Sequence, residues 1–319
     1  MAKNKLRAGV VGFGYLGYHH ARIYKELDNV ELVGIVDISE DRRKKAEKDF
    51  KVPAYQHFSE LISQGVDIVS VATPTVTHTE VALPILDAGI HLLIEKPLAD
   101  TMPNAKLIVE KAKERKCILQ VGHIERFNGA VKQLFHLIEK PLFIECHRLS
   151  PFPNRGTDVS VVLDLMIHDV DIVLKLTNSD VIQIDAVGVP VFSESEDIAN
   201  VRLRFSSGCV ANITASRVSM DRLRKIRIFS TQEYVSTDYT SQSLLLYRKR
   251  NAPIPKNGNL MDMIEITPIS VSNEEPLRAE IKSFVNSVLS GTLPEVTGED
   301  ALKALELCWK IINQIRNQE

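Results

Sequence analysis

The sequence lacks features that mark several classes of protein. Its 319 residues include four scattered cysteines (Cys117, Cys146, Cys209 and Cys308) and no Cys-x-x-Cys pair. Because each cysteine lies in an apolar context, we expect buried free thiols rather than disulfides or zinc ligands. No apolar run approaches the roughly 20 residues that a membrane-spanning helix needs. Internal repeats and low-complexity tracts are also absent.

Net charge is small as well. Lysine and arginine number 39 against 41 acidic residues, which gives a formal net charge of -2. This balance provides no electrostatic field for nucleic acid or an acidic membrane. A hydrophobic content of 44% is ordinary for a soluble globular protein, and the length allows two domains. The first five residues lead straight into a predicted strand, which leaves no room for a signal peptide, so we expect a cytoplasmic protein.

The first chemical motif is a glycine-rich turn. The apolar run Leu6–Val11 predicts a buried strand, and Gly12, Gly14 and Gly17 follow it at the spacing Gly-x-Gly-x-x-Gly. Gly12 permits a tight turn, Gly14 removes a Cβ where a pyrophosphate approaches, and Gly17 lets the next helix pack on the strand. The start of that helix offers N–H groups to phosphates. The pattern indicates dinucleotide binding; a purely structural turn is the other interpretation.

An acidic residue follows at the distance that such a fold requires. The apolar run Val30–Val36 predicts a second strand and ends at Asp37, about 20 residues past Gly17. A carboxylate there suits the ribose hydroxyls of adenosine and repels a 2′-phosphate, so NAD is favoured over NADP. Arg42 and Arg43 lie a turn into the next helix, where a cation would soften this preference, although both fit a solvated helix surface.

Strands and helices then alternate, which predicts a parallel, doubly wound Rossmann sheet with right-handed crossovers. In such sheets ligands lie beyond the carboxyl ends of the strands. The segments expected along that rim are the glycine-rich turn, Asp37, Thr73 to His78, Glu95 to Pro97 and Gly122 to Arg126.

After about residue 125, strand-like runs follow one another without helices between them. Ser206–Gly208 is a hairpin signal between two of these runs. The chain is therefore predicted to be an α/β protein whose second domain is α+β, on a large and mostly antiparallel sheet. We assign residues 1–124 to the Rossmann domain, 125–296 to a substrate-binding and oligomerisation domain, and 297–319 to a helix returning to the first domain.

A second chemical motif lies in an apolar helix expected over residues 161–176. Asp164 and His168 are four positions apart and Asp171 is three further, so the three share one helix face. Burying these groups is costly unless they serve a function, and a carboxylate beside an imidazole suits a general base. A structural His–Asp pair is the other interpretation, and no further ligand cluster supports a metal site. Asp169 points away and is predicted to be structural.

Lys96 is the third candidate, at the carboxyl end of a predicted strand between Glu95 and Pro97. An ammonium group there can polarise a substrate oxygen or donate a proton to it. A surface lysine at a strand end is the other interpretation.

These motifs, taken together, resemble a known family over essentially the whole chain. The matching segments are Gly12 to Gly17, Ala72-Thr73-Pro74-Thr75-Val76-Thr77-His78, Glu95-Lys96-Pro97 and Asp164-x-x-x-His168. Their order and spacing resemble the glucose-fructose oxidoreductase / inositol dehydrogenase / rhizopine catabolism family of sugar oxidoreductases. The resemblance implies that Lys96, Asp164 and His168 form the catalytic set, with the histidine as the usual proton acceptor. It also implies that Ala72 to His78 and Glu95 line the cofactor.

Two runs narrow the resemblance further. Val121–Asn128 and Val162–Asp171 are similar to the branch that oxidises UDP-N-acetylglucosamine at its 3-hydroxyl. Members of that branch feed an aminotransferase that makes a 3-amino sugar nucleotide for lipid A or surface polysaccharide. Where that branch often has proline after Arg-Phe-Asn, this chain has Gly129, a departure that bears on the helix start rather than on the chemistry.

The predicted contacts follow from these motifs. The cofactor contacts are Gly12, Phe13, Gly14, Tyr15, Leu16, Gly17, Asp37, Ile38, Ala72, Thr73, Pro74, His78, Glu95 and Lys96. The substrate contacts are Lys96, His123, Arg126, Asn128, Arg148, Asn154, Arg155, Asp164 and His168. The arginines are included because guanidinium groups suit the phosphate oxygens of a UDP-sugar, although each also fits an ordinary surface position. No metal ligand is predicted.

Other functions also fit the sequence. The substrate of such an enzyme could instead be inositol, a free sugar, or an imine such as a biliverdin-like or dihydrodiol substrate. A dinucleotide-sensing regulator uses the same fold, but intact Lys96, Asp164 and His168 argue against it. Alternation in Val201-x-Leu203-x-Phe205 supports two-sided packing, so we expect a homodimer or homotetramer through the C-terminal sheet.

Overall fold

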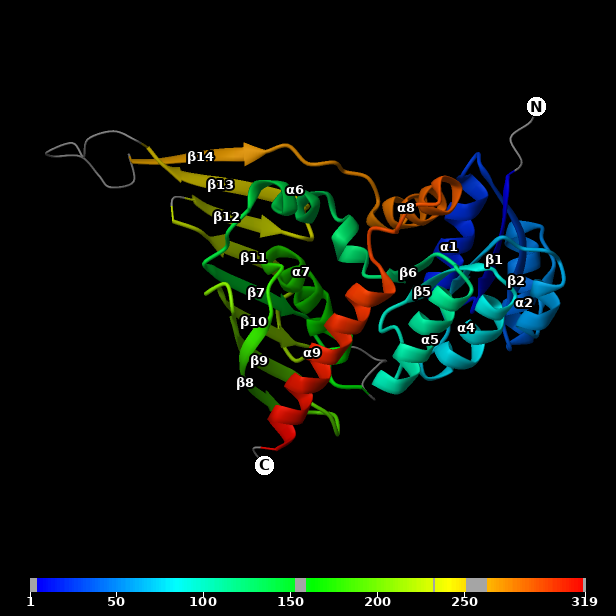
Figure 1. The fold of residues 1–319 in the computed structure, drawn as a ribbon, viewed down its shortest axis with the longest axis horizontal. Coiled ribbons are helices and arrows are strands. Elements are labelled where there is room, and N and C mark those ends of the chain that lie inside the picture. The colour runs from blue at the N-terminus through cyan, green and yellow to red at the C-terminus, as the bar shows by residue number, and fades with distance from the viewer. Residues whose placement is uncertain (1–4, 153–158, 232, 251–262, 318–319) are drawn as a thin grey trace, which may run out of the picture. The chain divides into compact units, whose positions relative to one another are not determined.

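The structure is a computed structural model that describes residues 5–152, 159–231, 233–250 and 263–317. These residues form two compact units (Figure 1). The first unit contains the chain up to Ile124 together with Pro276–Lys303, and the second contains Glu125–Glu275 and the chain from Ala304 onward.

The first unit is built on a six-stranded parallel sheet in the order β3-β2-β1-β4-β5-β6. Its strands are β1 (Leu6–Val11), β2 (Val30–Val36), β3 (Ala54–Tyr55), β4 (Ile68–Val71), β5 (His91–Glu95) and β6 (Leu119–Gly122). The strand order reverses between β1 and β4. This reversal is the switch point at which doubly wound sheets hold their ligands.

Helices cover both faces of this sheet. The elements are α1 (Tyr15–Glu26), α2 (Glu40–Phe50), α3 (Phe58–Ile62), η1 (Thr75–Thr77), α4 (His78–Asp87), α5 (Met102–Glu114) and α8 (Pro276–Ser290). The short helix η2 (Ile124–Phe127) begins at the end of this unit, and its remaining residues belong to the second. Helix α1 contacts α8, whereas α4 contacts α5, and Figure 1 shows the two pairs on opposite sides of the strands. The predicted Rossmann fold is confirmed.

Helix α8 belongs to the first unit, although the sequence assigned residues 276–296 to the second domain. Its apolar face, with Ile281 and Phe284 fully buried, packs in one core with Tyr24 of α1. Helix α9 (Gly298–Arg316) begins in the first unit and continues in the second. An apolar pattern predicts that a helix face is buried, but it does not say against which sheet.

The second unit contains an eight-stranded sheet in the order β14-β13-β12-β11-β7-β10-β9-β8. Its strands are β7 (Phe143–Leu149), β8 (Val181–Val189), β9 (Ile198–Phe205), β10 (Val210–Ser216), β11 (Leu223–Phe229), β12 (Glu233–Asp238), β13 (Ser243–Lys249) and β14 (Ile264–Ile269). Strands β7 and β10 are parallel, and the other neighbouring pairs are antiparallel. The expected hairpin turn joins β9 to β10, with Gly208 at φ +88°.

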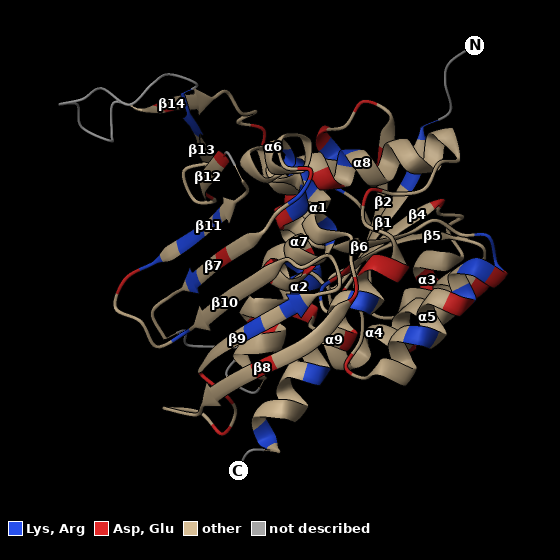
Figure 2. Cartoon of the chain, turned by 60° about the vertical axis from the view of Figure 1, so that its left-hand side comes forward, with Lys and Arg blue, Asp and Glu red and all other residues tan. Residues whose placement is uncertain are grey.

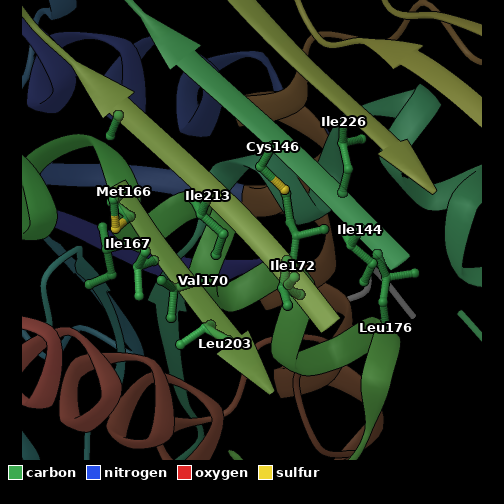
Figure 3. Packing of buried hydrophobic residues seen from close by; sticks show 14 of the residues in the cluster. Ile144, Cys146, Met166, Ile167, Val170, Ile172, Leu176, Leu203, Ile213 and Ile226 are labelled. Carbon is green, nitrogen blue, oxygen red and sulfur yellow. The ribbon is translucent and has the colours of Figure 1, made fainter. Parts of the chain in front are cut away.

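One face of this sheet is covered by helices. They are α6 (Gly129–Leu137), the π-helical turn η3 (Val162–Met166), α7 (Ile167–Thr177) and the later part of α9. Figure 3 shows the packing, with Cys146 of β7 and Ile213 of β10 among the side chains of α7. All four cysteines are free thiols, as expected; Cys146, Cys209 and Cys308 are buried, whereas Cys117 is partly exposed, contrary to the expectation. Burial raises the pKa of Cys209 to about 11.

The opposite face of the second sheet carries polar and aromatic side chains. Arg202 and Arg204 of β9 and Arg227 of β11 are exposed, and Figure 2 shows basic residues along β9 and β11. Four rings, those of Phe143, Phe229, Tyr234 and Tyr247, form a continuous row across β7, β11, β12 and β13. None of the helices in the described part of the chain combines the length and apolar character needed to span a bilayer.

The structure explains why glycine follows Asn128. A Cβ built on Gly129 would lie 2.1 Å from the backbone oxygen of Ser272, and the Gly129 N–H donates to Gln242 Oε1 at 3.0 Å. Proline normally suits the first position of a helix. Here it would clash and remove the donor.

We therefore expect Gly129→Ala to lower the free energy of unfolding by about 1–3 kcal/mol, because the neighbour is backbone and cannot move aside. Gly129→Pro is expected to cost more because the hydrogen bond is lost too. Denaturant unfolding of the three proteins measures this, and an unchanged midpoint for Gly129→Pro would contradict it.

Candidate functional site

The glycine-rich turn has the geometry that the sequence predicted for it. Gly12 has φ +91°, and a Cβ there would lie 2.6 Å from the Ala72 carbonyl oxygen. A Cβ on Gly17 would lie 1.7 Å from the oxygen of Gly12, so only glycine lets α1 pack this closely. Around Gly14, in contrast, a Cβ would meet nothing within 4 Å. That open space at the start of α1 fits a diphosphate group.

Asp37 ties the turn to the end of β2. Its Oδ2 accepts the Phe13 N–H at 2.7 Å and its Oδ1 accepts the Ser39 N–H at 2.8 Å. Each carboxylate oxygen has a further lone pair, so the group can also accept a ribose hydroxyl. Arg42 Nη1 lies 3.5 Å from Asp37 Oδ2. Arg43 is not simply solvated, because it donates to the backbone oxygens of Asp37 and Ile38.

Large apolar side chains are exposed around this turn. Tyr15 and Leu16 open α1, Ile38 follows Asp37, and Val76 lies in η1 after β4. Ile38 is 85% exposed and Val76 73%. Exposed apolar groups gathered on the loops at the carboxyl ends of one sheet indicate a surface that a ligand covers. Together with the open space at Gly14, they fit a bound dinucleotide.

His78 lies elsewhere than the sequence predicted. The side chain is 1% exposed; Nε2 lies 3.0 Å from the Thr73 carbonyl oxygen, and Nδ1 lies 3.1 Å from that of Pro97. Burial lowers the pKa of His78. The imidazole therefore braces the loops after β4 and β5 and is not open to a ligand. Of the predicted contacts on the first loop, Ala72 and Thr73 are partly exposed and Pro74 is exposed.

Lys96 follows β5 directly and is partly exposed. The preceding residue, Glu95, is buried, and its Oε1 lies 3.0 Å from Nε2 of the fully buried His20. Gly122 of β6 leaves room for this carboxylate, because a Cβ there would lie 2.8 Å from Glu95 Oε2. The sequence reasoning missed His20. In the sequence it is one of two adjacent histidines in α1, followed by Ala21 and Arg22, and nothing there marks it as buried.

The second motif lies on a π-helical turn. Asp164 is in η3 and His168 in the first turn of α7, and both are partly exposed where most of their neighbours are buried. The wider turn changes the regular four-residue spacing on which the sequence prediction rested. Such turns occur frequently at functional sites.

Val159 and Ser160, which precede η3, are held by hydrogen bonds to other residues of the second unit. Arg217 and Asp197 form a fully buried ion pair at 2.7 Å, and Arg217 Nη1 donates to the Val159 oxygen at 2.7 Å. The Ser160 oxygen in turn accepts the Asp164 N–H at 3.1 Å. This chain of bonds determines where Asp164 lies.

Arg126 and Asp171 form a buried pair rather than separate site groups. Arg126 is 2% exposed, and its Nε and Nη2 donate to the two oxygens of Asp171 at 2.7 and 2.6 Å. The predicted role of Arg126 at a substrate phosphate is therefore wrong in this structure. Asp171 is buried in this pair, whereas Asp164 is partly exposed, as His168 is, and Asp164 is therefore our first candidate to orient His168.

Arg148 is engaged in the same way. Its Nε and Nη2 donate to Asp169 at 2.8 and 3.0 Å, and its Nη1 donates to Glu125 at 2.8 Å. Burial alone would lower the pKa of Arg148, but the charges of Asp169 and Glu125 outweigh it and raise the pKa well above its usual value. The predicted phosphate contact is contradicted, because all three guanidinium nitrogens have partners. The structural role predicted for Asp169 is confirmed.

The other predicted substrate contacts divide into three groups. Asn128 is buried, caps α6 and donates to the Tyr239 oxygen at 3.0 Å, and His123 is 1% exposed. Asn154 and Arg155 lie outside the described residues. Lys96, Asp164 and His168 remain partly exposed, Lys96 on the first unit and the other two on the second. Among the described residues, no group of three or more His, Cys, Asp or Glu could hold a metal ion.

The buried ion pair of Arg148 and Asp169 leads to a prediction about stability. Arg148→Met should lower the free energy of unfolding by about 3–5 kcal/mol, because it leaves Asp169 buried without its cation. Arg227→Met is a matched control, since Arg227 pairs with Glu145 at 3.2 Å on the exposed face and should cost about 0–1 kcal/mol. Denaturant unfolding measures the free energy of unfolding of both variants. Equal decreases in the two would contradict the conclusion that the Arg148–Asp169 pair is buried and the Arg227–Glu145 pair is exposed.

Asp37 yields a prediction on cofactor choice. Asp37→Asn removes the charge that repels a 2′-phosphate but keeps one acceptor oxygen. We expect the preference for NAD over NADP to fall about tenfold, which corresponds to about 1.4 kcal/mol. Titration of both cofactors checks this, with the exposed Asp28→Asn as control. An unchanged preference in Asp37→Asn would exclude this role.

Two family models match the chain. Residues 6–123 match the family model described as an oxidoreductase family with an NAD-binding Rossmann fold. Residues 137–236 match the GFO/IDH/MocA C-terminal domain.

Two relatives cover nearly the whole chain. The UDP-N-acetylglucosamine 3-dehydrogenase of Acidithiobacillus ferrooxidans is 34% identical over 89% of this chain and 88% of its own length. The myo-inositol 2-dehydrogenase of Thermotoga maritima is 29% identical over 95% of this chain and 94% of its own.

Solved structures show the same fold. One of the A. ferrooxidans enzyme has a TM-score of 0.89 at 31% identity and covers 97% of each chain. That of a myo-inositol 2-dehydrogenase from Lactobacillus plantarum has a TM-score of 0.82 at 19% identity, over 99% of this chain and 98% of the other. The chain therefore belongs to the GFO/IDH/MocA family of oxidoreductases with an NAD-binding Rossmann domain.

Proposed function

We propose that this oxidoreductase uses NAD to oxidise the 3-hydroxyl of UDP-N-acetylglucosamine, which gives a 3-keto sugar nucleotide for amino-sugar synthesis. The observation that carries the proposal is the retained set of Lys96, Asp164 and His168, each partly exposed, in a chain 34% identical to an enzyme named for that reaction. A buried or replaced member of the set would have argued against catalysis.

The three side chains have distinct roles in this proposal. His168 accepts the proton of the hydroxyl, and Asp164 orients its ring and stabilises the imidazolium. Lys96 donates a hydrogen bond to the same oxygen as it becomes a carbonyl oxygen. When bound, NAD supplies the acceptor for the hydride that leaves the carbinol carbon.

NAD is the cofactor in this proposal because of Asp37. Its carboxylate is held at the end of β2 by two backbone N–H groups, where a 2′-phosphate would meet a negative charge. Arg42 is half-exposed and lies 3.5 Å from that carboxylate, so it reduces the repulsion without removing it. Strict exclusion of NADP is therefore not expected.

Oxidation of an inositol is the second candidate. Two observations favour it: the 29% identity to a myo-inositol 2-dehydrogenase over 95% of this chain, and the internal ion pairs of Arg126 and Arg148. Both guanidinium groups are bound to carboxylates, so two of the five arginine and asparagine candidates for the diphosphate of a UDP-sugar are already engaged within the protein.

We also propose that the protein assembles as a homodimer or homotetramer through the outer face of the second sheet. The row of rings from Phe143 to Tyr247 and the exposed side chains of β8, Ile182 and Val187, support this. Light scattering of the purified protein determines the oligomeric state.

The function is tested by following the absorbance of reduced nicotinamide with the purified protein, NAD and UDP-N-acetylglucosamine. Glutamate and a partner aminotransferase remove the keto product and pull the equilibrium forward. NADH formation with this substrate and not with myo-inositol would support the proposal. The reverse pattern, in protein shown to bind NAD, would favour the inositol reaction.

The roles of the side chains predict a selective loss. Lys96→Ala and His168→Ala should each lower turnover by about 10²–10⁴-fold, because each removes a group that acts on the reacting oxygen. NAD affinity, measured by fluorescence titration, should be nearly unchanged. Lys106→Ala and His136→Ala replace exposed residues of the same types in the same units and serve as controls. Wild-type turnover in either site variant would refute the assignment.

A further inference from the structure

The first unit buries a carboxyl group that has no hydrogen-bond partner. Glu280 of α8 is 0% exposed, and neither Oε1 nor Oε2 has a partner among the described residues. Its backbone oxygen accepts Nε2 of the buried Gln120 at 3.0 Å, so the two residues are neighbours. A charged carboxylate in such a place loses its hydration and gains nothing in return.

The groups around Glu280 are rich in acceptors. Gln120 Oε1 also lacks a partner among the described residues, and Glu95 carries its carboxylate close enough to act on Glu280 by its charge. Burial, and then the charge of Glu95, raise the pKa of Glu280 well above its usual value. His20 Nε2 donates to Glu95 Oε1, because a carboxylate can only accept.

The remaining polar neighbours offer Glu280 no cation. On α1, Tyr24 Oη is hydrogen-bonded to Ser70 Oγ of β4 at 2.7 Å. Burial raises the pKa of Tyr24, and its ring lies in the same core as Ile281 and Phe284, the neighbours of Glu280 on α8. Among the described residues, the polar groups that the structure relates to Glu280 are Tyr24 of α1, Glu95 of β5 and Gln120 of β6; His20 is bonded to Glu95 and Ser70 to Tyr24, and none of the five is a lysine or arginine.

We propose that Glu280 is a neutral, protonated carboxylic acid in the folded protein at neutral pH, and that it is a positioning residue for the end of β5. Protonation converts one carboxyl oxygen of Glu280 from an acceptor into an O–H donor. The unpartnered oxygens of Glu280 and Gln120 have no such donor among the described residues otherwise. A neutral Glu280 also leaves Glu95 as a single negative charge, held by His20, directly before Lys96 in the chain. The role at Lys96 rests on the proposed function; the protonation state does not.

Protonation of Glu280 makes stability depend on pH in a defined direction. The folded protein holds a proton that the unfolded chain releases above its ordinary glutamate pKa of 4.5. Stability is therefore fully present below that value and falls as the pH rises toward the folded pKa. Relative to Glu280→Gln, which cannot release a proton, the unfolding constant of the wild type should rise by up to about tenfold per pH unit.

Two measurements without substrate test the protonation state. Denaturant unfolding from pH 5 to pH 9 compares the wild type with Glu280→Gln and with the control Glu110→Gln, an exposed carboxyl of α5. As the pH rises, the free energy of unfolding of the wild type and of the control should fall relative to that of Glu280→Gln. If the free energies of all three proteins change with pH in parallel, the proposal is overturned. Infrared spectra should show the C=O band of a protonated carboxyl in wild type at pH 7; its absence would overturn the proposal even if Glu280→Gln failed to fold.

The positioning role is tested by turnover. Glu280→Gln should keep turnover near that of the wild type at pH 7 and change the alkaline limb of its pH profile, because a neutral donor is retained but no proton can be lost. Glu280→Ala should lower kcat at least tenfold with the KM for NAD unchanged. Equal kcat and the same pH profile in all three proteins would refute positioning. If no sugar substrate is oxidised at all, the unfolding and infrared results still decide whether Glu280 is protonated.

Discussion

Buried carboxylates need hydrogen-bond donors, and the way each one is satisfied distinguishes the two units of this protein. In the second unit the donors are arginines, each fully or almost fully buried. The pairs are Arg126–Asp171, Arg148–Asp169 and Arg217–Asp197. The first two pairs join η2 and β7 to α7, and the third joins Arg217, which follows β10, to Asp197, which precedes β9. As a result, the π-helical turn with Asp164 and the start of α7 with His168 rest on a rigid base, while these two side chains stay accessible.

Among the described residues of the first unit, buried carboxylates accept hydrogen bonds from backbone N–H groups or an imidazole rather than from buried arginines. Asp37 is satisfied by backbone N–H groups, which makes it part of the glycine-rich turn and fixes the carboxylate for a ribose. Glu95 is satisfied by a single imidazole, and Glu280 has no partner among the described residues. A proton replaces the missing donor in our account. The first unit thus buries the carboxyl groups of Glu95, at the end of β5, and of Glu280, on α8, a helix in contact with that strand; Lys96 follows Glu95 directly.

The sequence was sufficient where function depends on local geometry. Gly12, Gly17 and Asp37 could be predicted because a turn, a close helix approach and an acid at a strand end depend on spacing along one short segment. The pairing of Arg126 and Arg148 could not be predicted, because an arginine at a rim and an arginine in a buried ion pair look alike in sequence. Helix α8 was assigned to the wrong unit for a related reason: periodicity predicts a buried face but not the sheet that covers it. The π-helical turn changes the register by one residue and has no compositional mark.

The central claim is that a hydride leaves the carbon that bears the 3-hydroxyl of UDP-N-acetylglucosamine. Substrate carrying deuterium at that carbon tests the claim directly. The account predicts that the deuterium appears in the NADH formed, as measured by mass spectrometry, and that turnover is slower with the labelled substrate if hydride transfer limits the rate. NADH formed without deuterium would show that another carbon is oxidised and would contradict the account.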